Sequence, residues 1–195
     1  MAELPTGTVT FLFTDLEGST RLWEEHPSAM RAALARHDEI LRGAVEAQGG
    51  VVVKSTGDGL HAAFASAEGA LLAAAAGQVG LAAERFGDTG RLRVRMGIHT
   101  GASEVRNGDY FGPALNRAAR LMSVASGGQV VVSHATEELV GDALPEGLTL
   151  GDLGEHRLRD LSPRSGCFSC DRRTSTWSSR RFGPWIGYQA IFRFR

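Results

Sequence analysis

Residues 51–64, VVVKSTGDGLHAAF, decide the fold class. Two short apolar runs flank a Thr-Gly-Asp-Gly turn, and this pattern predicts a β-hairpin. Helical spacing precedes the hairpin over residues 16–50, and an alanine-rich helix is expected over residues 67–86. Helices interleaved with strands, including a tight hairpin, predict an α+β sandwich of the ferredoxin-like kind. Its sheet is expected to be mainly antiparallel, with the helices on one face.

The rest of the chain continues this alternation of strands and helices. Residues 8–15 form an apolar, β-branched and aromatic run that ends in an acid, which predicts a buried strand. Residues 91–106 alternate like a half-buried strand. Further along we expect a second hairpin or loop and then a helix within 107–128, a strand at 129–133, a short helix at 134–140 and edge strands within 148–158.

Composition and the N-terminal sequence predict the domain size and the cellular compartment. The 195 residues are 43% hydrophobic, enough for one domain with a core. The alanine-rich run carries Gly and Gln and ends in charge, well short of the roughly twenty strongly apolar residues that span a bilayer. The N-terminal residues lack the basic flank and apolar segment of a secretory signal. We therefore expect a cytoplasmic protein that does not cross a membrane.

Charge is distributed unevenly along the chain. The formal net charge is −1, but residues 163–195 hold seven arginines against the single acid Asp171. Residues 1–162 therefore carry a net charge of −7. Because phosphate contacts require a basic face, an acidic main domain predicts that nucleic acid is not a partner.

Two aspartates occupy places where a metal ion could bind. Asp15 ends the first strand and Asp58 lies in the hairpin turn, and these places are adjacent in a ferredoxin-like sheet. Converging carboxylates repel unless a cation lies between them, and oxygen ligands suit Mg²⁺ or Mn²⁺. The turn at 16–20, LEGST, leads into a helix whose free N–H groups can hold phosphate. These features predict a nucleoside triphosphate site. The alternative is that Asp15 caps the helix and Asp58 serves the turn.

Four segments, in order, resemble the motifs of the class III nucleotidyl cyclases, particularly the bacterial cyclase domains of actinobacterial regulatory proteins. They are FTDLEGSTRLWE, KSTGDGLHAAF, VRMGIHTG and GDYFGPALNRAARL. The resemblance covers roughly residues 7–161 and implies a cyclase domain at 1–162. The chain has no GKS or GKT phosphate loop and no GGDEF-type segment. P-loop NTPases and diguanylate cyclases are therefore poor alternative assignments.

The resemblance implies a metal and phosphate site. Asp15 and Asp58 match the family's metal-binding aspartates, and the backbone carbonyl of Leu16 is a further expected ligand. The implied cofactors are two Mg²⁺ or Mn²⁺ ions. The residues expected to bind the substrate at this turn are Leu16, Glu17, Gly18, Ser19 and Thr20.

The resemblance also implies a base and ribose site. Lys54 and Asp109 match the base-reading pair, Asn116 matches the residue that orients the ribose, and Arg120 matches the arginine that stabilises the transition state. Asn116 and Arg120, at i and i+4, share one helix face and can address one ligand. The alternative for both is an ordinary place on a helix surface.

The implied reaction is attack of the ribose 3′ hydroxyl of ATP on the α-phosphate, which yields cyclic AMP and pyrophosphate. In the resembling family the site is shared between two subunits, so a chain that carries both halves is expected to be a homodimer. The rival hypothesis is a catalytically weak or inactive cyclase-homology domain that binds nucleotide or dimerises as a regulatory module.

Residues 163–195 form an atypical tail. They contain no Leu, Val, Glu or Lys, and the short apolar strand that ends related domains is missing at the expected place. We predict a shift of reading frame near Ser162, or disorder, and an exposed sheet edge. The parent protein would then carry attached ATPase and regulatory modules. Cys167 and Cys170 have CxxC spacing but no partner cluster, a weak signal for a metal or redox site.

Overall fold

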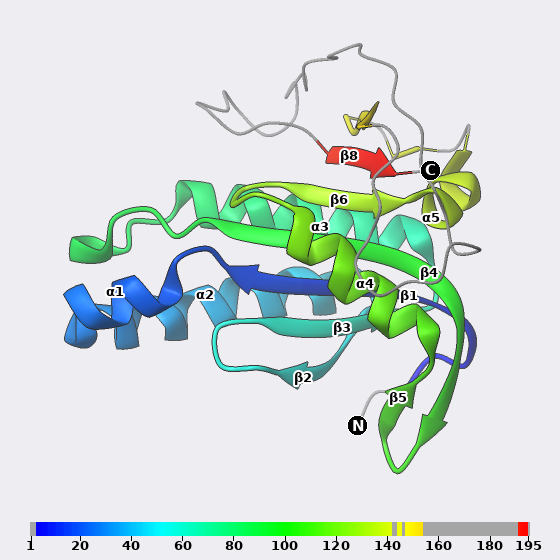
Figure 1. Cartoon of the computed structure of the whole chain (residues 1–195), viewed down its shortest axis with the longest axis horizontal. Helices are drawn as coiled ribbons and strands as arrows, with labels where there is room; N and C mark the ends of the chain where they lie inside the picture. Colours follow the sequence, from blue (N-terminus) through cyan, green and yellow to red (C-terminus); the bar gives the residue numbers. More distant parts are fainter. Residues whose placement is uncertain (1–2, 142–143, 146, 154–190, 195) are drawn as a thin grey trace.

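The computed structural model describes residues 3–141, 144–145, 147–153 and 191–194. In this part of the chain the strands form one sheet with helices packed against it (Figure 1). The strand order is β2-β3-β1-β4-β6-β8-β7, and β5 pairs with the far end of β4. The strands are β1 (Gly7–Leu16), β2 (Val51–Ser55), β3 (Leu60–Phe64), β4 (Val94–Arg106), β5 (Asp109–Phe111), β6 (Val130–Ser133), β7 (Leu150–Asp152) and β8 (Ile191–Phe194).

Local signals explain where the helices begin. The helical region expected at 16–50 is two helices, because Pro27 starts a new one after the break at His26. The Ser66 hydroxyl caps α3 by accepting a hydrogen bond from the Gly69 N–H at 3.0 Å. None of the helices within the described residues is long and apolar enough to cross a membrane. The helices are α1 (Ser19–Glu25), α2 (Pro27–Ala47), α3 (Ala67–Ala83), the 3₁₀ turn η1 (Gly87–Thr89), α4 (Pro113–Val124) and α5 (His134–Val140).

The α+β sandwich with a mainly antiparallel sheet is confirmed. Strands β2, β3, β1 and β4 pair antiparallel, and the predicted hairpin at 51–64 forms β2 and β3. The turn between them closes with a hydrogen bond from the Thr56 N–H to the Gly59 carbonyl, at 2.9 Å. Beyond β4 the pairing becomes parallel, through β6, β8 and β7.

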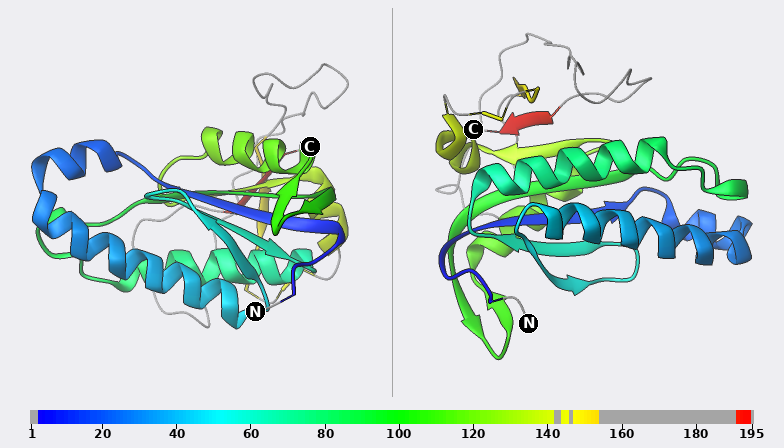
Figure 2. Two further views of the ribbon diagram at one scale, coloured as in Figure 1. Left: turned by 90° about the horizontal axis from the view of Figure 1, so that it is seen from below. Right: turned by 180° about the vertical axis from the view of Figure 1, so that it is seen from behind.

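The helices cover both faces of the sheet, so the expectation that they share one face was wrong. Leu12 of β1 points into the core beneath α2 and α3, whereas its neighbours Phe11 and Phe13 point to the other face. Because successive side chains of a strand alternate in direction, these two aromatic rings need their own cover. Helix α4 supplies it through Ala114 and Ala118 (Figure 2).

The end of the tail belongs to the sheet. Residues Ile191–Phe194 form β8, which pairs in parallel with both β6 and β7. The expectation that this position would be an exposed edge without a strand was therefore wrong, because four residues of the tail occupy it. The predicted change of reading frame near Ser162 and the cysteine pair at 167 and 170 lie outside the described residues.

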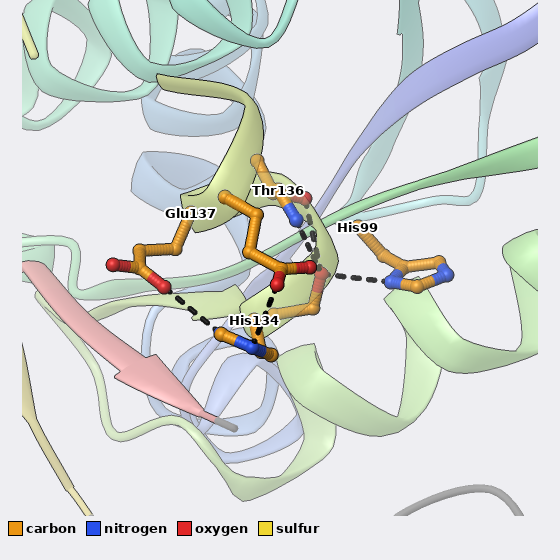
Figure 3. Close-up of polar contacts among 6 residues, drawn as sticks. His99, His134, Thr136 and Glu137 are labelled. Atoms are coloured by element: carbon orange, nitrogen blue, oxygen red, sulfur yellow. Dashed lines mark hydrogen bonds and ion pairs between the residues drawn. The ribbon is translucent and has the colours of Figure 1, made fainter. Parts of the chain in front are cut away.

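A buried polar network joins β1, β4, β6 and α5, and Figure 3 shows its part around His99 and Thr136. The His99 Nδ1 lies 2.8 Å from the Ser133 hydroxyl, which lies 3.0 Å from the Thr136 hydroxyl. From Thr136 the chain of hydroxyls continues to Thr100 and Thr10, at 2.9 Å for each step. Burial, helped by the charge of Arg117, lowers the pKa of His99 from 6.5 to about 4.

We predict that His99 makes the fold sensitive to acid. Its folded pKa is lowered, so between pH 6.5 and about 4 the unfolded chain binds a proton that the folded chain does not. The free energy of unfolding should therefore fall as the pH falls through this window, by about 3 kcal/mol in total. Urea unfolding at several pH values measures the slope.

The comparison is with His99→Gln, which keeps hydrogen-bonding groups but has no proton to gain. We expect this variant to lose most of the slope between pH 6.5 and 4. In the control, His134→Gln on α5, the slope should stay in place. Equal slopes in the wild type and the His99 variant would contradict the assignment.

Candidate functional site

The two predicted metal-binding aspartates lie at the same end of the sheet. Strand β1 pairs antiparallel with β3, and Phe13 is opposite His61. Continued toward the end of β1, this register brings the turn that carries Asp58 beside Asp15. The approach is close, because a Cβ added at Gly59 would lie 2.3 Å from the Thr14 carbonyl oxygen.

Arg95 holds the Asp15 carboxylate. The two residues are paired across β1 and β4, and the Arg95 Nε donates to Asp15 Oδ2 at 2.7 Å. Both side chains are partly exposed, at 34% for Arg95 and 24% for Asp15. Sequence reasoning missed Arg95, although it lies in the VRMGIHTG segment; its place opposite Asp15 depends on the strand register.

The donors at this end of the sheet fit a hard divalent cation. The side chain of Leu16 is buried in the core, so only its backbone carbonyl is suited to the role predicted for it. Within the described residues no three His, Cys, Asp or Glu side chains gather at a metal-binding distance. Two carboxylates and a carbonyl match the way Mg²⁺ is usually held, by few protein oxygens with substrate phosphates completing the shell.

The turn after β1 uses its glutamate for structure. Glu17 Oε1 accepts a hydrogen bond from the Gly127 N–H at 3.0 Å, and Arg93 Nη1 lies 3.5 Å from Glu17 Oε2. Arg93 also donates to the Gly127 carbonyl at 2.9 Å. This carboxylate is therefore engaged with the turn between α4 and β6, and the Glu17 N–H donates to the Arg93 carbonyl at 2.9 Å. Neither group of Glu17 is thus directed to the predicted substrate contact.

The backbone of the same turn carries the N–H groups that were predicted to bind phosphate. Gly18 has φ 72°, a left-handed conformation that suits glycine, and among the described residues no side chain caps the first turn of α1. Backbone N–H groups at the start of a helix have no partner within the helix. Ser19 and Thr20, predicted to bind substrate, lie in this first turn.

The charges of Lys54 and Asp109 both act on His61. Lys54 is the Cα partner of His61 across β2 and β3. Burial lowers the pKa of His61, the Lys54 charge lowers it further, and the Asp109 charge raises it, so both charges lie near the imidazole. Tyr110 brings β5 to this place, because its ring packs edge-on against Phe11 with 5.0 Å between the ring centroids. Sequence reasoning missed His61, even though it lies in the hairpin segment.

Helix α4 presents the predicted ribose and phosphate residues away from the sheet. Its inner face is formed by Ala114, Ala118 and Leu121, all buried. Asn116 is exposed and Arg120 is half-buried. A single chain therefore does not enclose Asn116. The structure brings the turn of Asp58 beside Asp15, and it places Lys54 opposite His61, whose pKa also responds to Asp109. Asn116 and Arg120 lie apart from these groups, on helix α4.

The adenylate and guanylate cyclase catalytic domain family matches residues 1–160. The chain belongs to this family. The match spans β1 to β7 and includes every predicted site residue. A nucleotidyl cyclase domain therefore accounts for most of the chain.

Relatives of this cyclase domain occur in bacteria and fungi. The uncharacterized protein Rv0891c of Mycobacterium tuberculosis is 43% identical over 159 residues, which cover 80% of this chain and 53% of that protein. The adenylate cyclase of Podospora anserina is 38% identical over 154 residues, covering 66% of this chain and 7% of the fungal protein. The chain thus spans about half the length of the mycobacterial relatives it matches.

Solved cyclase structures share the fold. An adenylate cyclase of Trypanosoma brucei, solved in its monomeric state, has a TM-score of 0.77 and 30% identity and covers 82% of this chain and 87% of its own. An adenylate/guanylate cyclase/hydrolase of Silicibacter pomeroyi has a TM-score of 0.65 and 31% identity, covering 80% and 90%. The α+β sandwich of the cyclase domain is thus also found in related proteins.

We predict that Gly97 is required for the position of α4. A Cβ at this residue would lie 2.3 Å from the Met122 backbone nitrogen and 2.6 Å from the Ala118 carbonyl oxygen. Gly97→Ala must therefore push the helix outward, and we expect a loss of about 1–3 kcal/mol in the free energy of unfolding. Urea unfolding measures this loss.

The control is Gly43→Ala on the exposed side of α2, where a Cβ meets nothing within 4 Å. This change should stabilise the chain by about 0.5–1 kcal/mol, because glycine is a poor helix residue. If both substitutions stabilise the protein, the contact between Gly97 and α4 does not constrain the helix.

Proposed function

We propose that this cyclase domain is an adenylate cyclase that converts ATP to 3′,5′-cyclic AMP and pyrophosphate. The observation that carries the proposal is that Lys54 pairs with His61 across β2 and β3 while the charges of both Lys54 and Asp109 act on the His61 ring. An ammonium donor and a carboxylate acceptor can together read one edge of a base. The family match and the fungal relatives named adenylate cyclase support the reaction class.

The chemistry of this pair favours adenine. Adenine presents N1 as an acceptor and its 6-amino group as a donor. Lys54 can donate to N1 and Asp109 can accept from the amino group, whereas guanine reverses both requirements. A mismatched base would leave Lys54 or Asp109 without a partner, which costs binding energy in a site closed to water.

The aspartates at the end of the sheet supply the metal site in this proposal. Asp15, Asp58 and the Leu16 carbonyl would hold two Mg²⁺ or Mn²⁺ ions, which lower the pKa of the attacking hydroxyl and neutralise the departing phosphates. Arg95 fixes the orientation of the Asp15 carboxylate. The N–H groups of the turn from Gly18 to Thr20 would bind phosphate oxygens.

Helix α4 contributes to positioning and to the transition state. Asn116 and Arg120 are four residues apart and so project from one face of the helix. Asn116 would orient the ribose so that its 3′ hydroxyl faces the α-phosphate. Arg120 would meet the negative charge that develops there, a contact that is strongest in the transition state.

We infer that two copies of the chain form the complete site. The metal aspartates of one copy would face the base pair and α4 of the other, giving a symmetric dimer with two sites. Exposure of Asn116 in a single chain supports this arrangement. We also propose that the domain comprises residues 1–162, acts in the cytoplasm and works within a longer regulatory protein, in keeping with the greater length of its mycobacterial relatives.

Activity and assembly can be tested together. With ATP and Mn²⁺ or Mg²⁺ the chain should form cyclic AMP, detected by chromatography. Asp15→Ala and Arg120→Ala should each lower kcat at least about 100-fold. Mixing the two variants should restore up to about a quarter of the wild-type rate, because half of randomly formed dimers are mixed and each holds one intact site.

The control substitution is Arg42→Ala on the exposed side of α2, which should leave the rate unchanged. No recovery on mixing would refute the shared site and leave a site within one chain. Nucleotide binding without product would indicate a regulatory module instead of an enzyme.

Base selection gives an independent prediction. Lys54→Arg keeps the positive charge but replaces a compact ammonium with a longer, forked guanidinium that fits one ring nitrogen poorly. We expect the ratio of kcat/KM for ATP to that for GTP to fall at least about tenfold, with the metal requirement unchanged. Arg31→Lys on α2 is the matched control. An unchanged ratio would show that Lys54 does not read the base.

A further inference from the structure

A row of paired residues crosses four strands on the face that carries α4. Gly97 of β4 is opposite Phe13 of β1, Phe13 is opposite His61 of β3, and His61 is opposite Lys54 of β2. Residues directly opposite each other on neighbouring strands project to the same face. At Gly97 the backbone of α4 fills the space where a side chain would stand. The row therefore runs from the helix, through two rings, to an ammonium group.

The His61 ring is held in one orientation. It stacks on the Phe13 ring with 3.7 Å between the centroids and 3° between the planes. Phe13 is buried and cannot move aside, while His61 is half-buried. One face of the imidazole is therefore covered, and Lys54 lies on the next strand beyond its other face. Only the edge of the His61 ring, which carries its nitrogen atoms, is therefore available to contact a ligand.

Burial, aided by the charge of Lys54, lowers the pKa of His61 and so favours a neutral ring at neutral pH. The charged groups that act on it are Lys54 from β2 and Asp109 from β5, while β1 presents the uncharged Phe13. Burial is the largest cause that lowers its pKa below 6.5, and Lys54 adds to the effect against the opposing Asp109. A neutral imidazole has one N–H donor and one acceptor nitrogen.

We propose that His61 is a third base-contacting residue, whose ring N–H donates to a purine ring nitrogen while Lys54 and Asp109 read the Watson–Crick edge. This inference rests on the proposed nucleotide site and adds a determinant of purine binding to it. Adenine and guanine both offer acceptor nitrogens outside that edge, at N7 and N3. The His61 contact therefore raises affinity for both purines and does not distinguish between them.

The test compares His61→Phe with the wild type. Phenylalanine can stack on Phe13 but has no ring nitrogen, so KM for ATP should rise about 3- to 10-fold with kcat within about twofold. KM for GTP should rise by the same factor, which leaves the preference between the purines unchanged. A role confined to packing would alter stability and kcat without this selective rise in KM.

Two further variants keep the test informative. His61→Gln restores an N–H donor without a ring and should recover part of the lost affinity, and it replaces the first variant if that one misfolds. His134→Phe, at the start of α5, is the matched histidine control and should leave KM unchanged. In the wild type KM should also rise as the pH falls below 6.5, because a protonated imidazole repels Lys54; His61→Phe should abolish this rise.

Failure of the proposed enzyme activity and failure of the His61 role can be told apart. Calorimetric titration with ATP and Mn²⁺ measures binding whether or not cyclic AMP forms. Affinity reduced about 3- to 10-fold in His61→Phe supports the contact even in an inactive chain. Equal affinities for the wild type and a folded His61→Phe, or a loss of kcat at unchanged KM, would overturn it.

Discussion

The close contact between α4 and the sheet at Gly97 is the constraint on which the rest of the site depends. The helix backbone lies where a side chain of β4 would otherwise project. This contact sets the height and direction of α4, which carries Asn116 and Arg120. Phe13 packs beneath the same helix, in one cluster with Ala114 and Ala118, and its ring stacks on His61, the strand partner of Lys54. The absence of a side chain at Gly97 thus sets the position of α4, and α4 in turn covers Phe13, the ring on which His61 stacks.

The charged groups at the end of β1 are arranged in pairs. Asp15 is held by Arg95, and Glu17 is held by Arg93 and the Gly127 N–H. Such pairing limits the motion of side chains that would otherwise reorganise when substrate binds, and preorganised charge is worth most in catalysis. The Glu17 contact also links the turn after β1 to the end of α4.

The elements of the fold follow from local patterns, whereas several contacts of the site do not. The hairpin at 51–64 was predictable because its turn residues and apolar runs act over a few positions. The cover of Phe11 and Phe13 by α4 was missed, because a pattern of alternation shows that two faces exist but not which helix packs on each. The strand Ile191–Phe194 was missed because its pairing with β6 joins residues about sixty positions apart.

By itself, the sequence determined the α+β class, the family and the identity of six candidate site residues, since these are written in residue types and short spacings. Only the tertiary structure decided that Arg95 pairs with Asp15, that Glu17 contacts the Gly127 turn and that His61 lies between Phe13 and Lys54 in the sheet. The physical reason is strand register. Pairing across a sheet joins residues that are far apart in the chain, and a shift of one position would turn each side chain to the other face.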